Sequence, residues 1–169
     1  MQYLMKTKTD CGPAAISAIT DKPYTEVCQA MKWANHGDGR DNLLDTPMNH
    51  FAALAKLGVP HRIVTCGQIL AGECKNNKTV ILIHAQGFPG SWLSQHWVVL
   101  ESVTPVRIAV HNGIGGIWGF TPAEFASAYS RGGPTATAYE VGMDGKKPSG
   151  LIARFGSFLS SLFGKLFGK

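Results

Sequence analysis

The sequence lacks a long apolar run. None of its uninterrupted apolar stretches reaches about 18 residues, the length that a membrane-spanning helix requires. The N-terminal stretch, MQYLMKTKTD, is too polar to hold the apolar region of a secretory signal peptide. We therefore expect neither Sec-dependent export nor a transmembrane segment.

Cysteine pairs arranged for metal binding are absent from the sequence. The four cysteines form no CxxC pair, and none of the six histidines stands at zinc-ligand spacing from them. A chain of 169 residues is also large enough to fold without disulfide bonds. We expect free thiols, no metal site and no cofactor. The cysteines are Cys11, Cys28, Cys66 and Cys74.

Charged side chains make up only 16% of the sequence, and much of the net charge of +5 comes from basic residues near the two ends. A nucleic-acid-binding surface usually combines clustered Lys and Arg with aromatic residues, and this chain has no such cluster. The hydrophobic share of 44% indicates one globular domain rather than a disordered chain. No nucleic-acid partner is expected.

The first third of the chain has the pattern of helices, and the rest has mainly the pattern of strands. Pro13 is tolerated in a first helical turn, Thr46-Pro47 opens a helix that stops at Gly58, and Thr121 is placed to cap another. Later apolar runs are short and rich in β-branched residues, which favours strands. Helices are expected over 11–19, 24–34, 47–57 and 122–129, and strands over 61–65, 79–84, 97–103, 106–111 and 136–141.

These elements predict an α+β fold in which an N-terminal helical part packs on an antiparallel sheet, with a cleft between them. Residues 1–141 form the expected domain, 142–150 are a linker by composition, and 151–169 form a separate amphipathic helix. The glycine-rich stretch 112–119 lacks the spacing of a phosphate-binding loop, so we expect a mobile loop beside the cleft.

One cysteine stands where a thiol can become a nucleophile. Cys11 begins the expected helix 11–19, and the N–H groups and dipole at a helix start lower the pKa of a thiol placed there. A single cysteine is more often a small buried apolar residue. The position of Cys11 therefore becomes informative only together with a base and a group that orients the base.

His96 and Asn112 supply those two groups. His96 precedes the apolar strand run WVVL, and Asn112 follows the next strand, 16 residues later. Two adjacent strands joined by a turn bring these positions together, and the side-chain carbonyl of Asn112 would then fix the tautomer of the imidazole. We predict a Cys11–His96–Asn112 catalytic triad.

The segments DCGPAA, HWVVLESVTPVRIAVHNG and WGFTPAEFASAY resemble the papain-like peptidases that process double-glycine leader peptides. The resemblance covers 9–129 and implies a papain-like fold in which Cys11 is the nucleophile and His96 the general base. The third residue in that family is usually an Asp followed by Pro, and Asn112-Gly113 stands at the matching position. Leader-peptide specificity is not implied. Those enzymes are usually joined to membrane transporters with an ATPase, and this sequence has neither transmembrane runs nor a GxxxxGK(S/T) phosphate loop.

The same family carries an oxyanion-stabilising Gln six residues before its cysteine, and Met5 occupies that position here. Gln2 is the candidate substitute, together with the backbone N–H of Cys11. Loss of one such donor typically lowers the rate by about 10²–10³, so we expect a reduced activity.

The expected function is cleavage of a peptide, isopeptide or amide bond in a peptide or protein substrate, through an acyl intermediate on Cys11. Two other functions stay open. Met5 favours a catalytically weak or inactive binding or structural module, for example a phage virion component, whose C-terminal helix is membrane-active. A peptidoglycan amide hydrolase is the other, and because its third residue is commonly His, His111 would then replace Asn112.

Residues 151–169 differ in kind from the domain. At about 100° per residue their Phe and Leu side chains gather on one side of a helix, opposite serines, glycines and basic residues. Such a helix suits an anionic membrane surface, or an apolar face of the domain or of a partner protein. We expect a cytoplasmic protein, or one delivered as a phage virion component or effector, that this segment attaches to a membrane or a partner. The expected contact residues are Leu151, Phe155, Phe158, Leu162, Phe163 and Leu166.

Overall fold

The computed structural model describes residues 4–6, 10–31, 46–85, 95–131 and 137–142. Within these ranges the chain has an α+β fold, with helices packed on an antiparallel sheet as the sequence predicts. Three expectations lie outside the described residues: the amphipathic helix 151–169, the linker beyond residue 142, and the position of Gln2.

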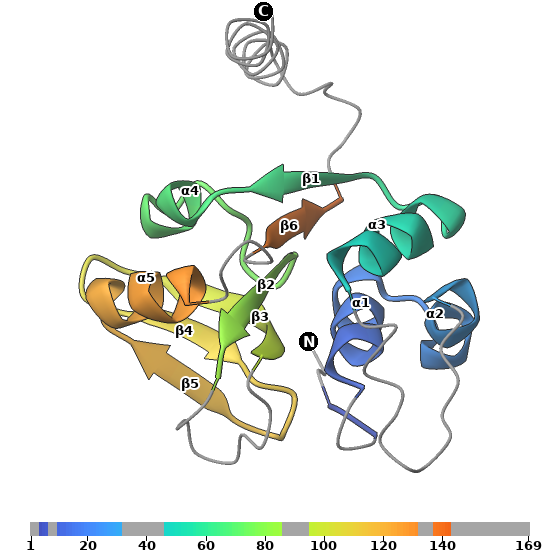
Figure 1. Cartoon of the computed structure of the whole chain (residues 1–169), viewed down its shortest axis with the longest axis horizontal. Coiled ribbons are helices and arrows are strands. Elements are labelled where there is room, and N and C mark those ends of the chain that lie inside the picture. The colour runs from blue at the N-terminus through green and yellow to red at the C-terminus, as the bar shows by residue number, and fades with distance from the viewer. Residues whose placement is uncertain (1–3, 7–9, 32–45, 86–94, 132–136, 143–169) are drawn as a thin grey trace, which may run out of the picture.

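In the described part of the chain, six antiparallel strands form the sheet, in the order β1-β6-β2-β3-β4-β5 (Figure 1). The last strand in sequence, β6, lies between β1 and β2, while β3 lies between β2 and β4 and is central. The strands are β1 (His61–Val64), β2 (Thr79–His84), β3 (Gln95–Val103), β4 (Ile108–His111), β5 (Ile117–Phe120) and β6 (Ala138–Val141).

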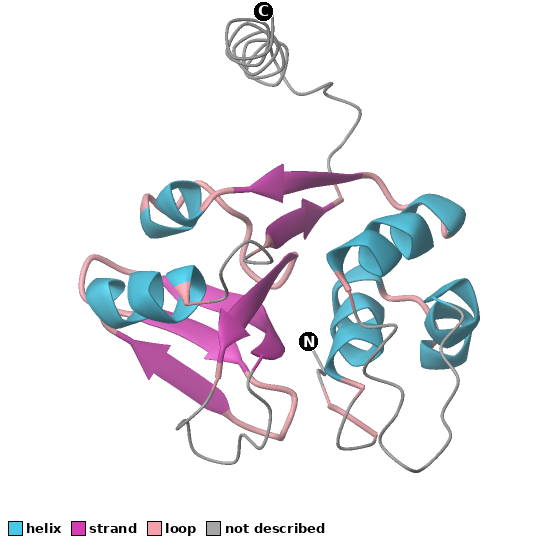
Figure 2. Ribbon diagram, in the orientation of Figure 1, coloured by secondary structure: helices cyan, strands magenta, loops and turns pink. Residues whose placement is uncertain are grey.

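Helices cover both faces of this sheet (Figure 2). Three N-terminal helices pack together on one face, and α4 and α5 lie on the other. The helices are α1 (Cys11–Thr20), α2 (Tyr24–Met31), α3 (Pro47–Lys56), α4 (Cys66–Leu70) and α5 (Pro122–Ser130). No helix among the described residues is both long and apolar enough to cross a membrane.

Each face of the sheet has its own apolar core, because successive side chains of a strand point to opposite faces. In β3, Trp97 and Val99 join the core beneath α1, α2 and α3. Val98 and Leu100 join the core beneath α4 and α5. All four side chains are fully or almost fully buried, so β3 is continuously apolar over these residues.

The helix boundaries follow local signals. The side chain of Thr46 accepts a hydrogen bond from the Asn49 N–H at the start of α3, and Thr121 caps α5 in the same way. Gly58 has a φ of +67°, a left-handed conformation that glycine adopts without strain and that ends a helix. The expected helix start at Thr46-Pro47, the cap of α5 by Thr121 and the stop at Gly58 are confirmed.

Two elements differ from the sequence-based expectation. A short helix, α4, follows β1, where Thr65 and Gln68 form a reciprocal capping box. The expectation of a loop over 112–119 is wrong in its second half, because β5 begins at Ile117. There Trp118 and Phe120 are buried while Ile117 and Gly119 are exposed, so this strand has a single buried face of two residues. Such a short alternation is easily missed in a glycine-rich sequence.

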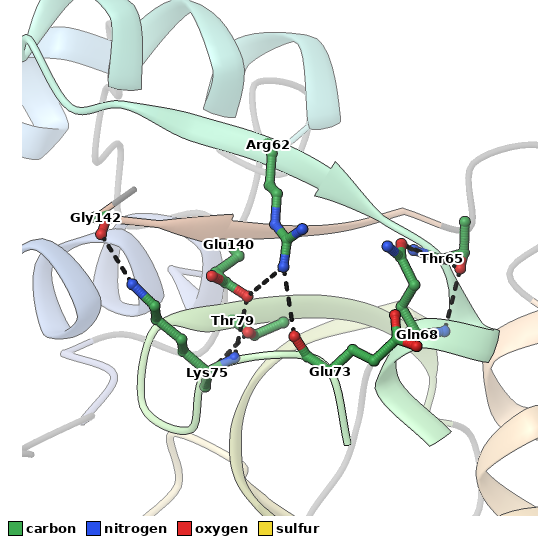
Figure 3. A network of polar contacts seen from close by, with 8 residues as sticks. All are labelled: Arg62, Thr65, Gln68, Glu73, Lys75, Thr79, Glu140 and Gly142. Carbon is green, nitrogen blue, oxygen red and sulfur yellow. Dashed lines mark hydrogen bonds and ion pairs between the residues drawn. The ribbon is translucent and has the colours of Figure 1, made fainter. Parts of the chain in front are cut away.

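A buried carboxylate holds the β1 end of the sheet together (Figure 3). Glu140 of β6 is 1% exposed; it pairs with Arg62 of β1 at 3.3 Å and accepts a hydrogen bond from the Lys75 N–H at 3.0 Å. Arg62 also donates to the Glu73 carbonyl, and the Lys75 ammonium donates to the Gly142 carbonyl. These contacts tie β1, β6 and the segment before β2 into one unit.

Candidate active site

Cys11 is the first residue of α1 and is 4% exposed. The helix begins with CGPAA, in which small side chains allow close packing and Pro13 occupies the first turn, where its missing N–H costs little. The helix packs on β3 and β2. The predicted nucleophile therefore lies at the start of a helix that packs on the central strand of the sheet.

Asp10 precedes Cys11 and is fully buried, but its side chain does not cap α1. Its Oδ2 atom instead accepts hydrogen bonds from the Tyr24 hydroxyl at 2.6 Å and from the Lys6 N–H at 3.0 Å. Burial, followed by the hydrogen bond to Asp10, raises the pKa of Tyr24 well above its ordinary range, so Tyr24 stays a protonated donor. No local sequence pattern indicates the pairing of Asp10 with Tyr24, because the two residues are 14 positions apart.

His96 is the second residue of β3 and is 1% exposed. Its Nε2 atom lies 2.5 Å from the main-chain carbonyl oxygen of Asn112. Because a carbonyl oxygen only accepts hydrogen bonds, Nε2 carries the proton, and Nδ1 is the basic nitrogen of the neutral ring. The Trp118 ring packs near the imidazole, with centroids 5.7 Å apart. His96 thus has a defined tautomer in an apolar setting.

Asn112 contacts His96 through a different group from the one expected. Its side-chain oxygen accepts hydrogen bonds from the N–H groups of Ile114 and Gly116, both at 3.0 Å, so the side-chain amide organises the turn between β4 and β5. That turn includes Gly113 and Gly115, which have φ values of +71° and +91°. The main chain of Asn112 orients the imidazole, and the side chain holds that main chain in place.

His111 does not take the place of Asn112. Its Nε2 atom contacts the Glu101 carboxylate. His111 is paired in register with Val99, so its side chain shares the face of Val99. His96 lies three positions before Val99 and points to the opposite face. The arrangement gives His111 no role in orienting His96.

Residues 4–6 bring the start of α1 and the turn after β4 to one corner of the molecule. The Met5 N–H donates to the Gly113 carbonyl at 2.8 Å, next to the residue that holds His96. The following residue, Lys6, is hydrogen-bonded to Asp10, next to Cys11. The Met5 side chain is partly buried against the core beneath α1 and carries no hydrogen-bond donor, so it cannot act as the oxyanion-stabilising Gln does.

Cys11 and His96 approach this corner from different faces of β3. Cys11 belongs to the core that contains Trp97, whereas the imidazole lies beside Trp118 of the other core. The two faces meet at the start of β3, where His96 is the second residue of the strand. The site offers a thiol at a helix start and an oriented imidazole.

The other three cysteines have environments that disfavour a thiolate. Burial raises the pKa of the Cys28 and Cys66 thiols, and it raises that of Cys74 to about 11, with the Glu140 carboxylate adding to the effect. All four cysteines are free thiols. In the described part of the chain, no three His, Cys, Asp or Glu side chains are grouped so that they could hold a metal ion.

Comparison with protein-family models and with curated proteins finds no match to this chain. The likeness to papain-like peptidases therefore depends on the quoted motifs and on what the site residues can do.

Proposed function

We propose that the protein is a papain-like cysteine hydrolase that cleaves a peptide or amide bond, with Cys11 as nucleophile and His96 as general base. The observation that carries the proposal is the hydrogen bond from His96 Nε2 to the Asn112 carbonyl. It makes Nδ1 the basic nitrogen, and an oriented imidazole with a defined tautomer is what a thiol nucleophile requires.

The chemistry follows from these two groups. Nδ1 of His96 takes the proton of the Cys11 thiol, and the thiolate attacks the substrate carbonyl carbon. The resulting tetrahedral intermediate collapses when the imidazolium gives its proton to the leaving nitrogen, which breaks the carbon–nitrogen bond and leaves a thioester on Cys11. Water, deprotonated by His96, then hydrolyses the thioester and restores the thiol.

The oxyanion of the intermediate needs hydrogen-bond donors. The backbone N–H of Cys11 is the proposed donor, and Gln2 is a second candidate that lies outside the described residues. Met5 supplies no side-chain donor, and its own N–H is engaged by Gly113. We therefore propose a slow enzyme. Its rate should be about 10²–10³ lower than that of an enzyme that also has a side-chain donor for the oxyanion.

A catalytically inactive binding or structural module is the second candidate. The burial of both residues favours it, because Cys11 is 4% exposed and His96 is 1% exposed, and a substrate must reach the thiol. A peptidoglycan amide hydrolase with His111 as third residue is less well supported, because His111 contacts Glu101.

The test compares Cys11→Ala and His96→Ala with the wild-type chain on a library of fluorogenic peptide and amide substrates. Each variant should abolish cleavage while keeping the wild-type circular dichroism spectrum and melting temperature. Cys74→Ala is the matched control, since it also removes a buried free thiol and should keep full activity.

The two candidates differ in a second measurement, alkylation of Cys11 by iodoacetamide. An enzyme should lose rapid Cys11 labelling when His96 is replaced by Ala. Equal labelling of both proteins, together with no cleavage by the wild type, would establish the inactive module instead.

A further inference from the structure

Residues 4–6 form an N-terminal strap that is fixed at both ends. At one end, the Lys6 N–H donates to the Asp10 carboxylate, and the Lys6 ammonium lies 4.3 Å from the centre of the Tyr24 ring. At the other end, the Met5 N–H donates to the Gly113 carbonyl. The strap therefore links the helical layer to the turn between β4 and β5.

Asp10 is the residue on which the helical end of the strap depends. An Asp that precedes a helix usually caps it with its side chain, and here that bond is absent. A fully buried carboxylate needs charge-stabilising donors, and Asp10 takes them from the strap and from Tyr24 of α2. One carboxylate thus joins the strap, α1 and α2 immediately beside Cys11.

The other end of the strap reaches the base. Gly113, which accepts from Met5, directly follows Asn112, whose carbonyl holds His96 Nε2. A short path of bonded neighbours therefore runs from Asp10, next to the thiol, to Asn112, next to the imidazole. This path connects the face of β3 that contacts Cys11 with the face to which the His96 imidazole points.

We propose that Asp10 is a positioning residue, which acts through the N-terminal strap to set the placement of Cys11 relative to His96. This inference rests on the function proposed above and adds a residue to it that touches no reacting atom. A misplacement of about 1 Å between reacting groups costs up to about 10²-fold in rate. Release of the strap should therefore uncouple the thiol from the imidazole without unfolding the domain.

The experiment measures the rate at which iodoacetamide alkylates Cys11 across a pH series, followed by mass spectrometry of the Cys11 peptide. In the wild type, the paired imidazole should keep Cys11 reactive below neutral pH, and His96→Ala should remove this reactivity. Asp10→Asn should lower the rate at acid pH by about tenfold or more, toward that of His96→Ala.

A matched control separates positioning from general destabilisation. Glu140→Gln alters another buried carboxylate, which also accepts a main-chain N–H (Figure 3) and lies on β6, a strand separated from β3 by β2. It should lower the melting temperature while leaving the pH profile of Cys11 labelling unchanged.

A second pair of variants acts on the other end of the strap, in case Asp10→Asn does not fold. Met5→Pro removes the N–H that binds Gly113, whereas Met5→Ala keeps it. Met5→Pro should lower the acid-pH labelling rate, and Met5→Ala should not.

The outcomes distinguish the two proposals. If His96→Ala slows Cys11 labelling but Asp10→Asn and Met5→Pro keep the wild-type profile, the positioning role is wrong and the proposed enzyme stands. If His96→Ala has no effect on labelling, Cys11 and His96 do not act together, and both proposals are overturned.

Discussion

At the scale of single residues, the molecule separates the role of a side chain from that of the main chain beside it. Asn112 stands where a triad asparagine is expected. Its main-chain carbonyl oxygen, and not its side-chain amide, accepts the hydrogen bond from His96 Nε2. The amide oxygen instead accepts two N–H groups of the turn. Asn112 therefore orients the imidazole through a group that every amino acid possesses.

A prediction follows for the replacement of Asn112. In Asn112→Ala the carbonyl that holds His96 persists, but the turn loses two hydrogen bonds, each worth about 1 kcal/mol. We expect a lower melting temperature and a loss in kcat/KM of about tenfold, well short of the about 10²–10⁴ expected for His96→Ala. Steady-state kinetics and thermal melts of both variants make the comparison.

Asn112→Asp is the control for this prediction, because a carboxylate accepts the same two N–H groups. It should restore most of the stability and activity. An Asn112→Ala enzyme as inactive as His96→Ala would show that the side chain itself orients the imidazole.

At the scale of elements, short helices depend on their ends because few residues contribute to packing. In α5 the Thr121 hydroxyl accepts from the Glu124 N–H, and the Thr121 N–H donates to the Glu124 carboxylate at 2.8 Å. These bonds from Thr121 lower the pKa of Glu124 below its ordinary value of 4.5. The capping box therefore favours the ionised carboxylate in the folded state.

The sign of the pH dependence follows from this lowered pKa. A carboxyl whose pKa is lower in the folded state stabilises the fold above its ordinary pKa, and this contribution disappears as the pH falls through the lowered value. Glu124→Gln should therefore melt about 1–3 °C below the wild type at neutral pH, and the two should converge at acid pH.

Differential scanning calorimetry over a pH series measures this effect. Glu26→Gln serves as the control, because Glu26 is a half-exposed acid near the start of α2 that pairs with Lys22 at 3.6 Å. A Glu124→Gln difference that persists unchanged at acid pH would mean that the charge of Glu124 does not contribute to the cap.

At the scale of the whole molecule, the sheet has two buried faces. The Cys11 thiol of α1 lies on one face, and the His96 imidazole of β3 points to the other. The sequence adds a segment beyond the described residues, 151–169, whose Phe and Leu residues share one side of the expected helix. Its basic residues and the net charge of +5 favour an anionic surface. We propose that this segment attaches the protein to an anionic membrane, with docking on the domain or on a partner protein as the alternative.

Vesicle flotation tests this attachment with full-length chains. Phe158→Asp places a charge on the apolar side and should abolish flotation on anionic vesicles at low salt, because the charge would have to enter the membrane interface. Ser160→Asp adds the same charge on the polar side and should largely keep flotation. Equal flotation of both variants would leave docking on the domain or a partner protein as the role of the segment.

The sequence by itself determined the elements whose signals are local. Some helix ends are set by contacts within a few residues, so the sequence pattern predicts them. These ends are set by Thr46 and Pro47, by Thr121 and Glu124, and by Gly58. The residue spacing also brought His96 and Asn112 together, because two strands joined by a turn determine which positions meet.

Only the tertiary structure decided the groups that depend on contacts distant in sequence. Tyr24 and the strap meet Asp10 because α1, α2 and residues 4–6 pack at one corner, and no local pattern records that meeting. β5 exists because β4 offers it an open edge and the core offers places for Trp118 and Phe120. The atom of Asn112 that reaches His96 was likewise set by the turn, because the turn's own N–H groups engage the amide first.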